Sequence, residues 1–226
     1  MGRSWEIVVW LLVFVAAVAV VIGIVRSEAA LTGGPGGQAA ALDDLRLSEI
    51  LAGPARDWDG DGVFDARRDE WLEVENYGAA PVDLGAYRVS DADSTIRFAF
   101  SGSLAPGAVV LINGRQAEDW QRMLGRTVSG LSLNNAGDTV ILFRIGANDT
   151  TAVDTKIYNS IEGASDRSTG RFGPGGAVWT LFDGLNKYTG SGQPQGTGCL
   201  PTPGAENGCP TPVNSATWGK IKVRFR

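Results

Sequence analysis

The 226-residue chain contains no histidine, and it has only two cysteines and two methionines. The lack of histidine removes the commonest general base, the Ser-His-Asp and Cys-His catalytic arrangements, and most transition-metal sites. The sequence also lacks a G-x-S-x-G nucleophile elbow, a Walker-type phosphate loop and a dinucleotide fingerprint after a predicted strand. We therefore expect a protein that is not an enzyme and that binds no organic cofactor.

A two-carboxylate glycosidase mechanism needs none of these motifs, and Glu73 and Glu75 are the candidates for it because alternate residues of a strand share a face. The intervening positions are apolar, with Leu72 and Val74 on the side expected to pack into a core. We therefore interpret the two glutamates as the solvent-facing side of a sheet rather than as a catalytic pair.

Positive charge is also scarce. The net charge is -5, and residues 43–75 carry eleven acids against four arginines. A surface of this sign repels phosphate backbones, so we expect no nucleic-acid partner.

The only long apolar run lies near the start of the chain. Residues 7–25 are nineteen consecutive residues without a charge; as a helix they would reach about 28 Å, close to the thickness of a bilayer core. We predict that residues 1–28 form a transmembrane signal anchor and that residues 29–41, rich in glycine and alanine, form a flexible spacer. The alternative is a cleaved signal peptide, because Ser27 and Ala29 would suit a cleavage site.

The two cysteines, Cys199 and Cys209, flank a segment rich in proline and glycine and could close a short loop through a disulfide. Such a bond requires an oxidising compartment, which predicts a globular domain on the extracytoplasmic side of a cell membrane. The alternative is two reduced thiols or a transient redox pair.

An acidic stretch after residue 56 carries the most informative local pattern. Asp57, Asp59 and Asp61 alternate and are followed by Gly62, which matches positions 1, 3, 5 and 6 of a calcium-binding loop. Position 12 of such a loop is a bidentate glutamate, but this sequence has Arg68 there and continues as a predicted strand rather than a helix. The pattern is therefore not that of an ordinary EF-hand.

Further acids downstream, Asp65 with Asp69 or Glu70, could complete a shorter site. We predict a structural calcium site whose ligands are Asp57, Asp59, Asp61, Asp65 and Asp69. The alternative is a solvated acidic turn, since aspartate and glycine also form turns that hold no ion.

Short apolar segments with period-two alternation recur through residues 42–209 and predict an all-β domain, a β-sandwich. The predicted strands are Leu45–Leu51, Trp71–Asn76, Tyr87–Ser90, Ile96–Phe100, Val109–Asn113, Thr139–Ile145 and Val153–Tyr158. Within Ile96–Phe100 the alternation places Arg97 on the face opposite the core. Residues 117–124 instead predict a short helix that packs on the sandwich through Trp120, Met123 and Leu124.

Residues 210–226 form a C-terminal extension that ends in alternating apolar and basic residues. This pattern predicts a strand with one basic face. Its lysines could protect a sheet edge, or the strand could dock on an acidic partner or on the acidic segment of a neighbouring copy.

Six segments in this order resemble the lamin-tail domain as it occurs in secreted bacterial proteins. They are Leu45–Ile50, Asp69–Asn76, Pro81–Asp91, Leu131–Leu142, Ala152–Asp154 and Thr202–Asn207. The resemblance spans roughly residues 43–207 and implies an immunoglobulin-like β-sandwich that serves as a binding or scaffolding module without catalysis of its own. The acidic loop and residues 115–130 are longer than the minimal family pattern, so we expect ligand contacts there first.

Together these features predict a non-catalytic, membrane-anchored, extracytoplasmic module that is stiffened by calcium and mediates protein contacts at the cell surface. The alternative is a calcium-dependent carbohydrate-binding module, for which Trp58, Trp120 or Trp179 would supply an exposed aromatic platform. The protein or surface polymer that it contacts is not specified by the residues.

Overall fold

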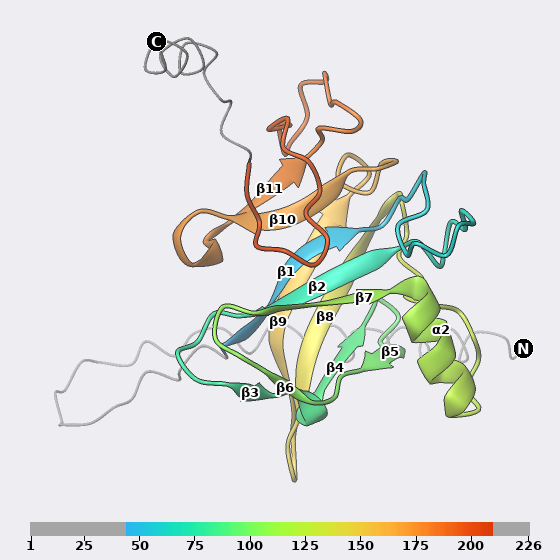
Figure 1. Cartoon of the computed structure of the whole chain (residues 1–226), viewed down its shortest axis with the longest axis vertical. Coiled ribbons are helices and arrows are strands. Elements are labelled where there is room, and N and C mark those ends of the chain that lie inside the picture. Colours follow the sequence, from blue (N-terminus) through green and yellow to red (C-terminus); the bar gives the residue numbers. More distant parts are fainter. Residues whose placement is uncertain (1–43, 210–226) are drawn as a thin grey trace, which may run out of the picture. The chain divides into compact units, whose positions relative to one another are not determined.

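Antiparallel strands dominate residues 44–209, the part of the chain that the computed structural model describes (Figure 1). Two main sheets share one hydrophobic core, and a two-stranded ribbon accompanies them. The predicted all-β sandwich is therefore confirmed. The predicted membrane anchor, the spacer and the C-terminal basic strand lie outside the described residues. No helix within residues 44–209 is long and apolar enough to cross a membrane.

The larger sheet has five strands in the order β11-β10-β1-β2-β7. Their bounds are β1 (Leu45–Leu51), β2 (Trp71–Asn76), β7 (Val109–Asn113), β10 (Ser168–Phe172) and β11 (Val178–Phe182). The smaller sheet has the order β5-β4-β8-β9. It comprises β4 (Tyr87–Ser90), β5 (Ile96–Ala99), β8 (Gly137–Ile145) and β9 (Thr150–Asn159). All seven strands predicted from alternation are present, with shifts of a few residues at their ends.

Shorter elements complete the described chain. β3 (Val82–Asp83) pairs with β6 (Ser103–Leu104), and two single-turn 3₁₀ helices are η1 (Leu84–Ala86) and η2 (Pro174–Gly176). One α-helix, α2 (Gly114–Met123), follows β7 directly.

The core lies between the two sheets. Leu47 and Val74 from the five-stranded sheet meet Val89 and Leu142 from the four-stranded sheet, and all four side chains are buried. Because alternate residues of a strand point to opposite faces, each sheet contributes one apolar face to this core.

Helix α2 begins at a capping box, in which the side chain of Asn113 accepts from the backbone N–H of Gln116 and the side chain of Gln116 accepts in return from Asn113. The helix packs on the domain through Ala117, Gln121 and the half-buried Trp120. The predicted packing face is therefore only partly right. Met123 is 74% exposed and Leu124 is 52% exposed, because the helix ends there and its last turn projects beyond the sheet.

Arg97, which the alternation places on the face opposite the core, is nevertheless buried. Its guanidinium is held by two aspartates: the Nη2 atom lies 2.5 Å from Oδ2 of Asp91 and 2.8 Å from Oδ2 of Asp93. The chain after β4 supplies both aspartates, and Ser129, after α2, accepts a further hydrogen bond from the guanidinium. A cation can be buried there only with paired acids.

Candidate functional site

The acidic loop, residues 57–69, connects β1 to β2 and brings three of the five predicted ligands together. Carboxylate oxygens of Asp57, Asp59 and Asp61 lie within 4.8 Å of one another. Oxygen donors gathered from alternate loop positions are the set that calcium prefers, so these three residues fit a hard cation.

Backbone hydrogen bonds within the loop produce this convergence. Asp57 accepts from the N–H groups of Gly60 (2.7 Å) and Gly62 (2.8 Å), and Asp59 accepts from that of Asp61 (3.0 Å). The two glycines have φ angles of +75° and +87°, a region that strongly favours residues without a Cβ. The sharp turn expected at Gly62 is therefore present. The N–H of Gly62 is also the main reason that the pKa of Asp57 lies below its ordinary value.

Asp65 and Asp69 have a different role from the one that their spacing suggests. Asp69 is buried and accepts from the backbone N–H groups of Trp58 (2.7 Å), Asp59 (2.9 Å) and Asp65 (2.7 Å). Asp65 caps the turn after it by accepting from the N–H groups of Arg67 and Arg68. Both carboxylates brace the loop backbone, and neither belongs to the group of three converging acids.

Arg115 of α2 was not identified from the sequence, yet it reaches the converging acids. Its Nε atom lies 3.0 Å from Oδ2 of Asp59, and its Nη1 atom lies 3.2 Å from Oδ2 of Asp61. The side chain of Asp59 is only 1% exposed. Burial raises the pKa of Asp59, although the N–H of Asp61 and the charge of Arg115 oppose this shift. The guanidinium thus supplies positive charge where a bound cation would supply it.

The three tryptophans proposed as a sugar platform are half-buried and packed. Trp58 meets Trp71 edge-on at 5.9 Å between ring centroids, and its indole N–H donates to Asp166. Trp120 packs on Phe98. The ring of Trp179 has Lys156 Nζ at 4.9 Å and Arg171 Cζ at 4.8 Å from its centroid. Their rings therefore contact the domain itself rather than forming one open aromatic face.

The interpretation of Glu73 as a solvent-facing residue is wrong. Glu73 lies directly opposite Glu49 in the β1–β2 pairing, and both side chains are fully buried. A segment far away in sequence covers them: Thr202 donates to Glu49 through its N–H (3.2 Å) and its hydroxyl (2.6 Å), and the N–H of Gly204 donates to Glu73. This part of the sheet face is therefore covered by protein rather than by water.

Desolvation changes the acidity of this buried glutamate pair, Glu49 and Glu73. Burial raises the pKa of Glu49 to about 7. Burial, together with the adjacent charge of Glu49, raises the pKa of Glu73 to about 8. Glu75 is half-buried on the same strand. Because Glu73 is covered by protein, it and Glu75 do not form an open two-carboxylate site of the glycosidase kind.

The segment that covers the glutamates is closed by the predicted disulfide between Cys199 and Cys209. Asn207 ties it to the sheet further, since its side-chain amide donates to the carbonyl oxygens of Ser48 and Arg171, each at 2.9 Å. We call residues 199–209 the disulfide loop.

A family model described as the lamin tail domain matches residues 38–160. The chain belongs to the lamin tail domain family. Members of this family are non-catalytic, immunoglobulin-like domains, in agreement with the sandwich described above. No curated protein matches the chain. The match includes the acidic loop and α2 but ends before β10, β11 and the disulfide loop, so the closing motif assigned to Thr202–Asn207 lies outside it.

Proposed function

We propose that this lamin-tail domain is a non-catalytic binding and scaffolding module, anchored in a cell membrane through residues 7–25 and exposed on the extracytoplasmic side, where it contacts other proteins. Membership of the lamin-tail family is the observation that carries this proposal. The apolar run supports the anchor. The disulfide supports an oxidising compartment.

Calcium is the proposed structural ligand of the acidic loop. Asp57, Asp59 and Asp61 would hold the ion, and Asp65 and Asp69 would support it by fixing the loop backbone. An ion that binds the folded loop and not the unfolded chain stabilises the fold in proportion to the logarithm of its concentration. Arg115 would have to share or give up its contacts with Asp59 and Asp61 when calcium binds.

The test is the melting temperature of the full chain, purified in detergent, in EDTA and then in millimolar calcium, with magnesium as the control ion. We expect a rise that is specific to calcium, because magnesium demands a tighter octahedral geometry and loses its water reluctantly. The double variant Asp59→Asn/Asp61→Asn should abolish the rise. An unchanged melting temperature of the parent chain on addition of calcium would show that the loop is an acidic turn that holds no ion.

Membrane attachment is tested separately by fractionation of cells that express the full chain. The anchored form should stay in the membrane pellet after alkaline carbonate washing, and external protease should digest residues 42–226 in intact cells after any outer wall has been removed. Recovery of the chain in the soluble fraction would contradict the anchor without affecting the calcium result.

The carbohydrate-binding alternative gains no support from the tryptophans, because each ring is already packed against the domain. Binding to a polysaccharide that is lost in Trp58→Ala, with the fold retained, would be needed to revive it.

A further inference from the structure

The disulfide loop, residues 199–209, is held on the outer face of the five-stranded sheet by two acids (Figure 1). Glu49 of β1 lies directly opposite Glu73 of β2, and both side chains are fully buried. Thr202 donates to Glu49 through its N–H and its hydroxyl, and Gly204 donates to Glu73 through its N–H. The two carboxyl groups therefore hold the middle of the loop against the sheet.

The ends of the loop are fixed separately from its middle. The disulfide joins Cys199 to Cys209, and the carbonyl oxygen of Cys199 accepts from the N–H of Gly184, just after β11, at 2.7 Å. Between these ends, residues 203–206 are exposed, and Asn207 supplies two further hydrogen bonds to the sheet. The middle of the loop can therefore lift from the sheet while its two ends stay joined.

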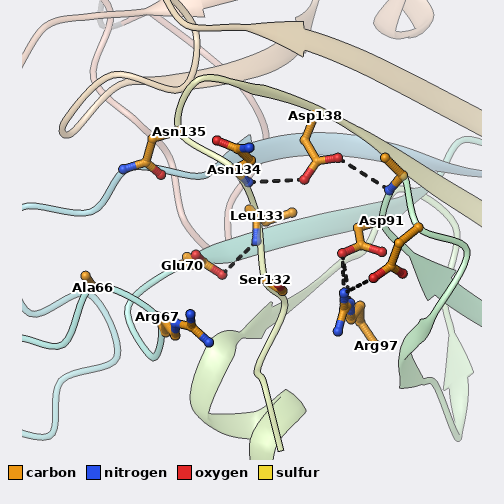
Figure 2. A pocket seen from close by; sticks show the side chains of 12 residues that line it. Ala66, Arg67, Glu70, Asp91, Arg97, Ser132, Leu133, Asn134, Asn135 and Asp138 are labelled. Carbon is orange, nitrogen blue, oxygen red and sulfur yellow. Dashed lines mark hydrogen bonds and ion pairs between the residues drawn. The ribbon is translucent and has the colours of Figure 1, made fainter.

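The glutamate pair under the loop has no counter-ion. Elsewhere in the domain a buried acid lies beside a base, as Asp91 does beside Arg97 (Figure 2). Within residues 44–209 no lysine or arginine forms an ion pair with Glu49 or Glu73. Two carboxylates directly opposite each other in a sheet repel, and burial without a counter-ion removes their hydration as well. The closed loop therefore favours a protonated pair.

The surrounding elements do not reverse this balance. Four charged side chains lie on them: Glu75 on β2, Glu206 on the disulfide loop, Arg46 on β1 and Arg171 on β10. The charge of Glu75 raises the pKa of Glu73 further. Arg171 is paired with Asp154 at 2.9 Å, and Arg46 lies opposite Glu75 in the β1–β2 pairing. The other groups around the pair are uncharged: Ser48, Leu111, Ser168, Thr202 and Asn207.

The raised pKa values of the pair agree with this geometry. They are about 7 for Glu49 and about 8 for Glu73, and burial is the main cause of both shifts. When the loop lifts, water reaches both groups, and they ionise near the ordinary value of 4.5. The closed form therefore binds more protons than the open form does, so a rising pH favours the open form.

We propose that the disulfide loop is a pH-dependent cover, closed over Glu49 and Glu73 when the pair is protonated and lifted from the sheet when both groups ionise. In the open form the two carboxylates face solvent, so this side of the domain becomes more acidic. The device goes beyond the proposed function and requires neither calcium nor the membrane anchor.

Hydrogen exchange of the full chain in detergent and EDTA, followed by mass spectrometry at pH 6, 7 and 8, tests the proposal. After correction for the chemical exchange rate at each pH, the protection of the amides in residues 200–208 should fall by about a hundredfold or more between pH 6 and pH 8, because each carboxyl group favours the open form by about tenfold or more over this range. Protection in the turn between β8 and β9 should not change.

The strands under the loop distinguish lifting from unfolding of the whole domain. Lifting leaves β1 and β2 paired with each other, so at pH 8 their amides should remain at least about tenfold better protected than those of the loop. Equal protection of the loop and the strands would mean that the loop leaves the sheet only when the domain unfolds.

Variants of the pair locate the pH response. Glu49→Gln/Glu73→Gln keeps an acceptor oxygen at each position and removes both titrating groups, so the protection of the loop should be nearly the same at pH 6 and pH 8. Glu73→Gln alone leaves Glu49 to titrate and should retain a change of about tenfold. Glu206→Gln, an exposed acid of the same loop, is the matched control and should respond as the parent chain does.

The proposal is overturned if the protection of the loop is the same at pH 6 and pH 8, if the loop and the strands are equally protected at pH 8, or if Glu73→Gln responds as strongly as the parent chain. These outcomes are separable from the proposed calcium site, because the exchange is measured in EDTA and Asp59→Asn/Asp61→Asn should leave the response of the loop unaffected.

Discussion

The β1–β2 hairpin carries two groups of acids that behave in opposite ways. In the connection between the strands, the aspartates of the acidic loop receive backbone N–H donors, and the pKa values of Asp57 and Asp65 are lowered, whereas burial raises that of Asp59. On the strands themselves, Glu49 and Glu73 are covered by the disulfide loop, and burial raises their pKa values. The contrast shows that solvent and hydrogen-bond donors, rather than the density of acids, decide how a carboxyl group ionises.

Removal of the Glu49 side chain should have the largest effect on stability. Glu49→Ala leaves the hydroxyl of Ser168 and the N–H of Thr202 without their acceptor under a covering segment, and the hydroxyl of Thr202 keeps only Asn207 as an acceptor. We expect the free energy of unfolding to fall by about 4 kcal/mol, since each buried donor that loses its partner costs about 1–3 kcal/mol. Urea denaturation of the full chain in detergent measures the loss. Glu206→Gln, an exposed acid of the disulfide loop, is the control and should change stability by less than about 0.5 kcal/mol.

Opening the disulfide loop should have the next largest effect. Cys199 and Cys209 are ten positions apart, and a link of this span stabilises a fold by about 3 kcal/mol in the chain-entropy model. Urea denaturation with and without dithiothreitol gives the measurement. The double variant Cys199→Ser/Cys209→Ser should match the reduced parent and should not respond to the reductant. Equal stability of the oxidised and reduced parent would mean that the disulfide loop stays folded over Glu49 and Glu73 without the Cys199–Cys209 bond.

The pH dependence of stability should separate the two groups of acids. A carboxyl group whose pKa is raised in the folded state binds more protons there than in the unfolded chain, so its contribution to stability is fully present below the unfolded pKa and is lost as the pH rises through the folded pKa. For Glu49 and Glu73 this window runs from 4.5 to about 7 and about 8. We expect the full chain in EDTA to lose several kcal/mol, up to about 6 kcal/mol, between pH 5 and pH 8.5.

Glu49→Gln/Glu73→Gln should make this part of the profile shallower, because the amides do not titrate. Glu70, whose pKa burial raises to about 8, continues to titrate in the same range. Asp57 and Asp65 act with the opposite sign: their lowered pKa values stabilise the fold above the ordinary aspartate range and lose that effect as the pH falls. A profile that rises between pH 5 and pH 8.5 would contradict the assignment of raised pKa values to the buried pair.

The local patterns of the sequence predicted the strands well and their surroundings less well. Alternation identified β2 and placed Leu72 and Val74 in the core, as observed. It also assigned Glu73 to solvent, because a period of two distinguishes two faces of a sheet but does not say what covers either one. The cover is a segment about 130 residues later in the chain, as the contact between Gly204 and Glu73 shows.

Strand β10 was missed for a related reason. Its sequence contains Gly170, a residue that weakens strand propensity. A Cβ at this position would clash with the ring of Phe182 on β11 and come within 3.1 Å of Cγ of Glu49. The glycine therefore serves close packing between strands, which only the assembled sheet makes visible.

The acidic loop was predicted from its spacing, but its cationic neighbour was not. Asp57, Asp59 and Asp61 converge as alternate positions should. Arg115 belongs to a helix that begins more than fifty residues later, so no motif within the loop could indicate it.

A substitution of Arg115 should have the smallest effect of those considered. Arg115 balances the charge of Asp59 and Asp61 in the acidic loop and makes no ion pair with Glu49 or Glu73. Arg115→Gln removes the guanidinium that neutralises Asp59 and Asp61. The melting temperature in EDTA should fall slightly, because the acids then repel one another unopposed. The calcium-induced rise should become larger, with calcium affinity higher by roughly threefold to tenfold, because the ion no longer competes with a resident cation.

Melting curves over a calcium series measure both changes, and Arg122→Gln, an exposed arginine of the same helix, is the matched control. If Arg115→Gln instead weakened the calcium effect, the guanidinium would be a support that positions the two carboxylates rather than a competitor for them. The pH profile between pH 5 and pH 8.5 should be nearly the same in this variant as in the parent, since Glu49, Glu73 and Glu70 produce most of it and Arg115 shifts the pKa of none of them.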